Sequence, residues 1–103
     1  MKTWNDLKNF DLRVYGADWC PDCLRFKRIL QRNGLSFTDI DIDQDLEARD
    51  SMVQRAGEFS IPQLEIDGRW MVRGWHSEAL GNWNEKTFFT ELARTVDPTP
   101  DRV

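Results

Sequence analysis

The sequence predicts an α/β fold in which a four-stranded mixed sheet carries helices on both faces. Short apolar or alternating segments, typical of strands, are interspersed with longer segments of helical periodicity. Their order is strand, helix, strand, helix, strand, strand, helix. The first two strands flank a helix long enough for a right-handed crossover and should be parallel, whereas the last two should form an antiparallel hairpin.

Length and composition limit the class of protein. The chain has 103 residues, which fits a single domain with one core, and its 40% hydrophobic content contains no run near the ~18 apolar residues of a membrane span. The net charge of −4 disfavours non-specific nucleic-acid binding. The N-terminus lacks the apolar stretch of a signal peptide, so we expect a cytoplasmic protein. We also expect a monomer with neither a nucleic-acid nor a membrane partner.

The first half of the chain predicts two strands and a long helix between them. Residues 2–10 predict a short helix, because apolar residues recur three apart, and Leu12 to Tyr15 predicts a strand. After a loop, Pro21 fits the first turn of a helix, where its missing N–H costs nothing, and Asn33-Gly34 ends that helix. The alternation over Phe37 to Ile42 predicts the second strand.

The middle of the chain predicts a helix and a hairpin. Asp43 is expected to cap the helix and Gly57 to end it. Gln63 to Ile66 predicts a strand, Asp67-Gly68 a hairpin turn, and Arg69 to Arg73 the returning strand. One side of the helix is expected to carry Leu46, Arg49, Val53 and Ala56.

A last helix follows a loop that begins at Gly74. Ser77 is expected to cap a short helical turn, and Asn84 the last helix. We expect a domain of residues 1–103 with a core over about 12–95 and a flexible tail, 97–103. The apolar face of the last helix is formed by Phe88, Phe89 and Leu92.

The chain's only two cysteines lie in Cys20-Pro21-Asp22-Cys23, where a strand passes into a helix. This position predicts a dithiol that cycles to a disulfide. Cys20 would be the exposed attacking nucleophile at the helix start, and Cys23, one turn further in, the more buried resolving thiol. A structural disulfide of this spacing is disfavoured because it removes little entropy from the unfolded chain. A structural zinc site needs four ligands, and with one His and no third Cys, Asp or Glu would have to complete the set. We therefore expect no metal. Two unreactive cysteines remain the alternative.

Residues around the cysteines are expected to tune the thiol and bind the substrate. Pro21 should keep the turn rigid, and the charge of Asp22 should raise the pKa of Cys20 and make the disulfide harder to reduce. Asp22 also fits a helix-start acid that stabilises the first turn. Trp19 and Trp75 are expected to form an apolar rim where partner proteins dock, with a core role for both as the alternative.

The motif at Cys20, the segment Ser60-Ile61-Pro62 and the hairpin turn resemble the thioredoxin superfamily, and the short chain resembles its glutaredoxin branch. The resemblance implies a thioredoxin fold and a dithiol-disulfide oxidoreductase that reduces protein disulfides or mixed disulfides. It also implies a cis peptide between Ile61 and Pro62, where Ile61 offers its backbone N–H and C=O to the substrate. An ordinary trans Pro opening an edge strand is the alternative.

The chain departs from family members that use glutathione. Where they carry cations it has Ala17 and Phe59, although Arg49, Arg55 or Arg73 could supply the missing charge. Its loop Gly74 to Ser77 resembles that of the redoxins that serve ribonucleotide reductase, and Trp19-Cys20 resembles mycoredoxins. We therefore expect no bound cofactor and an external reductant: glutathione, mycothiol, or thioredoxin reductase with NADPH. The missing cations favour an uncharged thiol or a protein donor.

Two other functions fit the same scaffold. One is a glutathione-dependent iron–sulfur cluster carrier, which the rigid Pro21 and the weak glutathione site disfavour. The other is a redox-inactive binding module, which the two intact cysteines disfavour. The partners expected for the favoured function are disulfide-containing proteins and a thiol or flavoprotein reductase.

Overall fold

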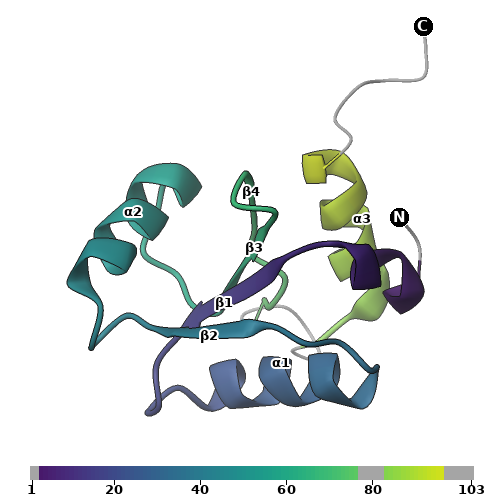
Figure 1. Ribbon diagram of the computed structural model, residues 1–103, viewed down its shortest axis with the longest axis horizontal. Coiled ribbons are helices and arrows are strands. Elements are labelled where there is room, and N and C mark those ends of the chain that lie inside the picture. The colour runs from purple at the N-terminus through teal and green to yellow at the C-terminus, as the bar shows by residue number, and fades with distance from the viewer. Residues whose placement is uncertain (1–2, 77–82, 97–103) are drawn as a thin grey trace, which may run out of the picture.

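The computed structural model describes residues 3–76 and 83–96 and contains every predicted strand and long helix in the expected order (Figure 1). The helical turn expected at Ser77 and the tail 97–103 lie outside the described residues. None of the described helices is long and apolar enough to cross a bilayer. The strands are β1 (Leu12–Gly16), β2 (Thr38–Asp41), β3 (Gln63–Ile66) and β4 (Trp70–Val72). The helices are the 3-10 helix η1 (Trp4–Asn9), α1 (Pro21–Arg32), α2 (Leu46–Ala56) and α3 (Glu85–Val96).

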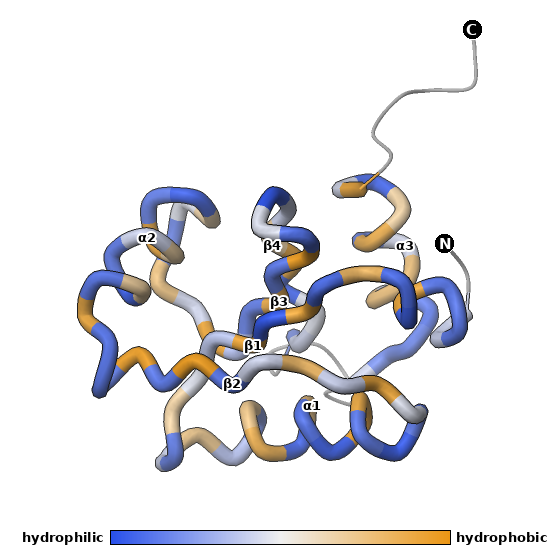
Figure 2. Tube along the Cα trace, in the orientation of Figure 1, coloured by the Kyte–Doolittle hydropathy of each residue, from blue (hydrophilic) through white to orange (hydrophobic). Residues whose placement is uncertain are grey.

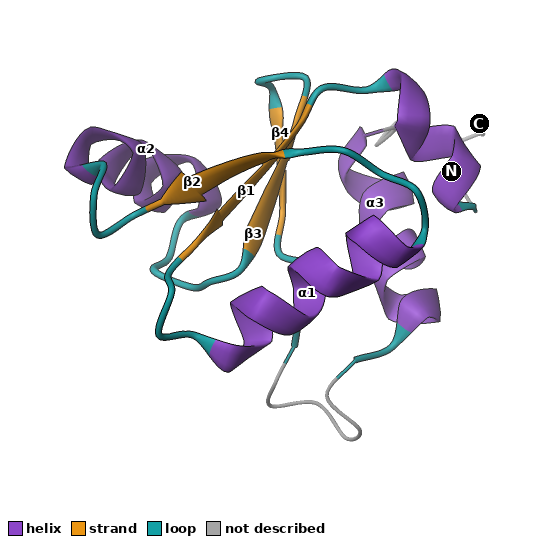
Figure 3. Ribbon diagram, turned by 60° about the horizontal axis from the view of Figure 1, so that its bottom comes forward, coloured by secondary structure: helices purple, strands orange, loops and turns teal. Residues whose placement is uncertain are grey.

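The four strands form one mixed sheet in the order β2-β1-β3-β4. β1 and β2 are parallel, as the crossover helix predicted, whereas β3 pairs antiparallel with both β1 and β4. Helices α1 and α3 cover one face of the sheet and α2 covers the other (Figure 3). The predicted mixed sheet with helices on both faces is confirmed.

Two clusters of buried residues, one on each face of the sheet, form the core. Along α1, hydrophobic positions recur in a hydrophilic ribbon, as expected for a helix that buries one side (Figure 2). The larger cluster lies under α1 and α3 and comprises Leu7, Leu12, Val14, Phe26, Leu30, Leu35, Leu64, Ile66, Val72, Trp75, Phe88, Phe89 and Leu92. The smaller cluster lies under α2 and comprises Tyr15, Ala17, Cys20, Cys23, Ile42 and Met52.

The ends of α1 and α3 follow the predicted signals. Pro21 is the first residue of α1, and the helix ends at Asn33 and Gly34, whose φ of 77° is left-handed. Asn84 caps α3, because its Oδ1 accepts a hydrogen bond from Thr87 N–H at 2.9 Å. Local capping chemistry therefore sets where these two helices begin and end.

The prediction that Asp43 caps α2 is wrong. Asp45 is the cap: its Oδ1 accepts from Ala48 N–H at 2.9 Å, so the helix begins two residues later than predicted. Asp43 instead accepts a hydrogen bond from the Trp19 indole. Of the residues expected on one side of α2, Leu46 is exposed, and the fully buried Met52 was not among them.

A turn centred on Asp67 and Gly68 closes the β3–β4 hairpin, as predicted. Asp67 (φ 55°) and Gly68 (φ 68°) are both left-handed, as a type I′ turn requires. Two hydrogen bonds of 2.8 Å, one from Asp67 N–H to Asp11 O and one from Asp11 N–H to Asp67 Oδ1, hold the turn against the start of β1. The regular strand β4 covers only the middle of the predicted Arg69 to Arg73 segment.

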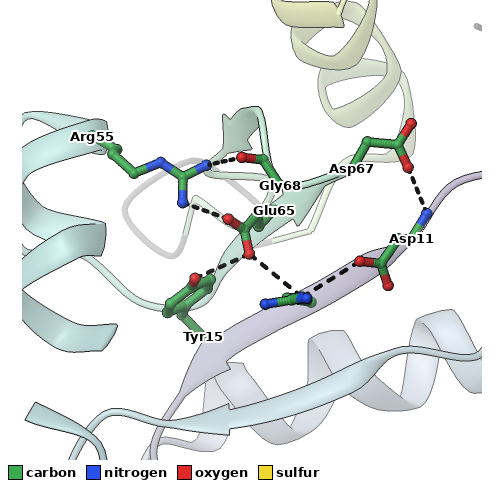
Figure 4. A network of polar contacts seen from close by, with 7 residues as sticks. Asp11, Tyr15, Arg55, Glu65, Asp67 and Gly68 are labelled. Atoms are coloured by element: carbon green, nitrogen blue, oxygen red, sulfur yellow. Dashed lines mark hydrogen bonds and ion pairs between the residues drawn. The ribbon is translucent and has the colours of Figure 1, made fainter. Parts of the chain in front are cut away.

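A buried carboxylate joins α2 to the sheet and to the hairpin turn (Figure 4). Glu65 of β3 accepts a hydrogen bond from Tyr15 Oη at 3.0 Å and pairs with Arg55 of α2. Arg55 also donates to Gly68 O at 3.2 Å, and Arg13 lies 3.9 Å from Glu65 Oε1. Burial and the bond to Glu65 raise the pKa of Tyr15. A buried charge needs such partners to offset its lost hydration.

Candidate active site

Cys20 occupies the cap position at the start of α1. Its Sγ accepts a hydrogen bond from Cys23 N–H at 3.2 Å, and its carbonyl oxygen accepts from Leu24 N–H at 3.2 Å. The sulfur therefore stands at the positive end of the helix dipole, in contact with a backbone donor, where negative charge is favoured. Cys20 is only 6% exposed, so the expectation of a freely exposed thiol is wrong, although Cys20 is more accessible than the fully buried Cys23.

Cys23 is a buried thiol directly beneath the helix start. Burial, reinforced by its hydrogen bond to Cys20 and the charge of Cys20, raises the pKa of Cys23 to about 12. A hydrogen bond with the Ala17 backbone and the charge of Lys27 act in the opposite direction and lower this pKa. In the reduced protein Cys23 therefore keeps its proton at neutral pH.

Gly16, at the end of β1, is needed for space beside the thiol pair. A Cβ atom at this position would lie 2.9 Å from Cys23 Sγ and 3.1 Å from Cys23 Cβ. Contacts this short force neighbouring atoms to move. This role was not predicted from the sequence. The only signal was that a glycine directly follows the predicted strand Leu12 to Tyr15.

The charges of the first turns of α1 are paired. Asp22 Oδ1 binds Arg25 at 2.8 Å, and Lys27 Nζ binds Asp39 Oδ2 at 2.9 Å. The negative charge of Asp22 beside the thiol pair is therefore opposed by a cation on the same helix turn. Its place in the first turn also fits the helix-stabilising alternative.

Trp19 and Trp75, which were expected to form one apolar rim, differ strongly in solvent exposure. Trp19 is 64% exposed, and its Nε1 donates a hydrogen bond to Asp43 Oδ2 at 2.7 Å. Trp75 is only 4% exposed and stacks on Trp83 with 5.5 Å between ring centroids. The expectation that Trp75 lines an exposed rim is wrong, because stacking in the larger cluster removes its large apolar surface from water.

The Ile61-Pro62 peptide bond is cis, as the resemblance implied. Pro62 is buried, and Ile61 packs against the smaller cluster, which contains both cysteines. The segment before β3 therefore lies beside the cysteine pair, where the substrate-binding role expected for Ile61 and Pro62 requires it.

The positions where glutathione-using relatives carry cations hold none here. Ala17 is buried, and Phe59 is exposed with the Arg49 guanidinium 5.1 Å from its ring centroid. Arg55, which could have supplied charge, is paired with Glu65 and bound to Gly68. Within residues 3–76 and 83–96 no group of three His, Cys, Asp or Glu side chains is placed to hold a metal ion.

This fold, with a cysteine pair at the start of α1 and a cis-Pro before β3, is that of the thioredoxin superfamily, to which the glutaredoxin family belongs. The glutaredoxin family model matches residues 12–71. The chain belongs to the glutaredoxin family, whose members are thiol-disulfide oxidoreductases that typically take electrons from glutathione.

Proteins of similar sequence are also glutaredoxins. A glutaredoxin of Pseudomonas aeruginosa is 40% identical over 53 residues, which are 52% of this chain and 63% of that protein. Glutaredoxin 3 of Escherichia coli is 34% identical over 59 residues, 57% of this chain and 71% of that protein. The match thus spans under two thirds of the Pseudomonas protein.

Solved structures share the fold. The thioredoxin-like protein BC3987 superposes with a TM-score of 0.57 at 30% identity over 68% of this chain and 94% of that one. A glutaredoxin from Archaeoglobus fulgidus superposes with a TM-score of 0.60 over 89% of this chain and 96% of its own, and at 20% identity it supports the fold alone.

Proposed function

We propose that this chain is a dithiol-disulfide oxidoreductase that reduces protein disulfides or mixed disulfides, with Cys20 as nucleophile and Cys23 as resolving thiol. The observation that carries the proposal is the asymmetry of the pair. Cys20 Sγ accepts a backbone hydrogen bond at a helix start, whereas Cys23 is fully buried and its pKa is raised to about 12. One sulfur is thus arranged to carry negative charge and the other to hold a proton.

The reaction has two exchange steps. The Cys20 thiolate attacks one sulfur of the substrate disulfide, forms a mixed disulfide and releases the other sulfur as a thiolate, which takes a proton from water. Cys23 then loses its proton to water, and its thiolate attacks Cys20 Sγ. The second substrate sulfur leaves as a thiolate, which takes a proton from water, and a Cys20–Cys23 disulfide remains. The substrate gains two electrons and the protein loses two, so an external reductant must restore the dithiol.

The first step also prepares the second. Two of the causes that raise the pKa of Cys23 are its hydrogen bond to Cys20 and the charge on Cys20. In the mixed disulfide the charge on Cys20 is lost and its sulfur is a weaker hydrogen-bond acceptor, while burial, the largest cause, and the lowering effects of Lys27 and the Ala17 backbone remain. Formation of the mixed disulfide therefore lowers the pKa of Cys23 and favours the attack that resolves it.

Single-cysteine variants test the division of labour. Cys20→Ser should abolish reduction of any disulfide substrate, because the first bond cannot form. Cys23→Ser should retain the first step and accumulate a mixed disulfide that intact-mass spectrometry detects. Limiting iodoacetamide followed by peptide mapping should label Cys20 first, and preferential labelling of Cys23 would contradict the assignment.

We also propose that the reductant is an uncharged thiol such as mycothiol or a reductase protein, rather than glutathione. Glutathione carries two carboxylates, and each charge-assisted contact to a matched cation contributes about 1.5–3 kcal/mol. Here Ala17 is buried, Arg49 lies over Phe59 and Arg55 is paired with Glu65. These placements support weak capture of glutathione.

Parallel assays distinguish the donors. The oxidised protein is offered glutathione with glutathione reductase, mycothiol with its reductase, or thioredoxin reductase with NADPH, and turnover of a mixed-disulfide substrate is followed. Rapid turnover with glutathione at cellular concentration would show that other residues rebuild the anion site. The cysteine assignments would stand in that case, because they are tested independently by the single-cysteine variants.

A further inference from the structure

The residue directly before the nucleophile is an exposed aromatic ring that a carboxylate fixes in place. The Trp19 indole is 64% exposed, and its Nε1 donates to Asp43 Oδ2 at 2.7 Å. Asp43 lies in the loop between β2 and α2, so this bond joins the loops that follow the adjacent parallel strands β1 and β2. A disulfide that reaches Cys20 therefore meets an ordered pair of ring and carboxylate.

The two joined loops carry negative charge and no positive charge. Residues 16–20 contain one Asp and residues 41–45 contain three, and neither segment contains Lys or Arg. The cations on the first turns of α1, Arg25 and Lys27, are each paired with an acidic side chain, at 2.8 and 2.9 Å. The approach to Cys20 along these loops is therefore electrostatically negative. The four acidic residues are Asp18, Asp41, Asp43 and Asp45.

We propose that Trp19 and Asp43 are specificity-determining residues that select disulfides with positive charge beside the reacting sulfur, such as a cystine flanked by Lys or Arg. The inference rests on the proposed function and names its substrate class. An indole face attracts a cation, and no described residue binds the second oxygen of Asp43, Oδ1. The same field disfavours anionic disulfides. The bonds formed and broken are those of the two exchange steps above.

A charge series of small disulfides tests the proposal. Reduced protein is mixed with cystamine, which carries two ammonium groups, with neutral bis(2-hydroxyethyl) disulfide, and with dithiodiglycolate, which carries two carboxylates. Each second-order rate constant is divided by that of dithiothreitol with the same disulfide, which removes intrinsic differences in reactivity. We expect the normalised rates to fall from cystamine to the neutral disulfide to dithiodiglycolate, with about tenfold between the extremes at low salt.

Two matched variants locate the effect. Asp43→Asn removes the charge but keeps an amide oxygen that accepts the Trp19 bond, and it should reduce the ratio of cystamine to neutral rates about threefold, the effect of one unit charge at about 6 Å in water. Asp11→Asn makes the same charge change at the opposite end of β1, and at 0.1 M salt, where the Debye length is about 10 Å, it should leave the ratio nearly unchanged.

The outcomes are distinguishable. Equal normalised rates for the three disulfides, or equal ratios in Asp43→Asn and the unmodified protein, overturn the inference and leave the proposed function intact. Failure of the reduced protein to react with all three disulfides overturns the proposed function and the inference with it. A preference for cystamine that Asp43→Asn and high salt both diminish supports the inference.

Discussion

The Cys23 thiol packs directly against Gly16, the last residue of β1. This close contact predicts the effect of the Gly16→Ala substitution. Because the new methyl group would lie 2.9 Å from Cys23 Sγ, we expect a loss of about 1–3 kcal/mol of unfolding free energy and slower resolution of the mixed disulfide. Urea unfolding measures the first effect, and mass spectrometry of the intermediate measures the second.

A double-mutant cycle controls that experiment. In a Cys23→Ala background the sulfur is absent, so Gly16→Ala should cost less than in the unmodified chain, and the difference gives the energy of the contact. An equal cost in both backgrounds would show that the strand, rather than the thiol, excludes a side chain at this position.

The raised pKa of Cys23 makes the stability of the reduced protein depend on alkaline pH. In the unfolded chain this thiol ionises near its ordinary pKa of 9.0, whereas in the folded protein its pKa is about 12. Between these values only the unfolded chain has lost the proton, so the unfolding free energy falls as pH rises, by up to about 1.4 kcal/mol per unit. Below about pH 9 the contribution is fully present.

Denaturation of the reduced protein at a series of pH values from about 8 to 10.5 checks this dependence. The unmodified chain should lose stability more steeply than Cys23→Ala. Tyr15, whose pKa is also raised, contributes in the same direction in both proteins and cancels in the comparison. Parallel curves for the two proteins would contradict the assignment of Cys23 as the buried, protonated thiol.

At the scale of single elements, the start of α2 gives a direct test of capping. Asp45→Ala removes the bond to Ala48 N–H and should cost about 1 kcal/mol of unfolding free energy. Asp43→Ala leaves the cap intact and is the matched control, since it loses only an exposed bond to Trp19. Chemical denaturation measures both. A larger loss for Asp43→Ala would support the cap predicted from the sequence.

The same helix shows how far the sequence could predict the elements. The order of elements, the crossover, the hairpin turn and the caps of α1 and α3 follow from local signals such as Pro21 and Asn84. At α2 the predicted cap, Asp43, is instead bound to Trp19, which lies 24 residues away in the chain, and Asp45 is the cap. Local helix-capping propensity does not predict the contact between Trp19 and Asp43.

The site was predicted to a similar degree. The spacing of Cys20 and Cys23 identifies the dithiol and its order of burial. Trp75 is buried where it stacks on Trp83, which precedes α3, and the contact of Gly16 with Cys23 depends on how β1 and α1 pack. Both are tertiary contacts, which residue type and spacing do not predict.

At the scale of the whole molecule, the buried Glu65 couples α2 to the sheet, and its partners make unequal predictions. Arg55→Met leaves the carboxylate buried without its main cation and should cost about 3 kcal/mol of unfolding free energy. Arg13→Met removes a half-exposed cation 3.9 Å away and should cost less than about 1 kcal/mol. Urea denaturation of both variants measures the difference.

A compensating variant sharpens this comparison. Glu65→Gln removes the charge and keeps an oxygen for the Tyr15 bond, so Arg55→Met with Glu65→Gln should be more stable than Arg55→Met alone. If the double variant is the less stable one, the cost of Arg55→Met lies in lost packing of its side chain and not in an uncompensated charge.

The division of the core into a larger and a smaller cluster implies a hierarchy of opening. The smaller cluster packs beneath α2, so detachment of this helix exposes the contacts of Met52 and leaves the larger cluster closed under α1 and α3. In hydrogen-exchange terms, amides of α2 should exchange through a partial opening that costs less than global unfolding, while those of α1 and α3 exchange only with the whole domain. Because Cys23 belongs to the smaller cluster, the excursion that deprotects α2 would also admit solvent to the resolving sulfur.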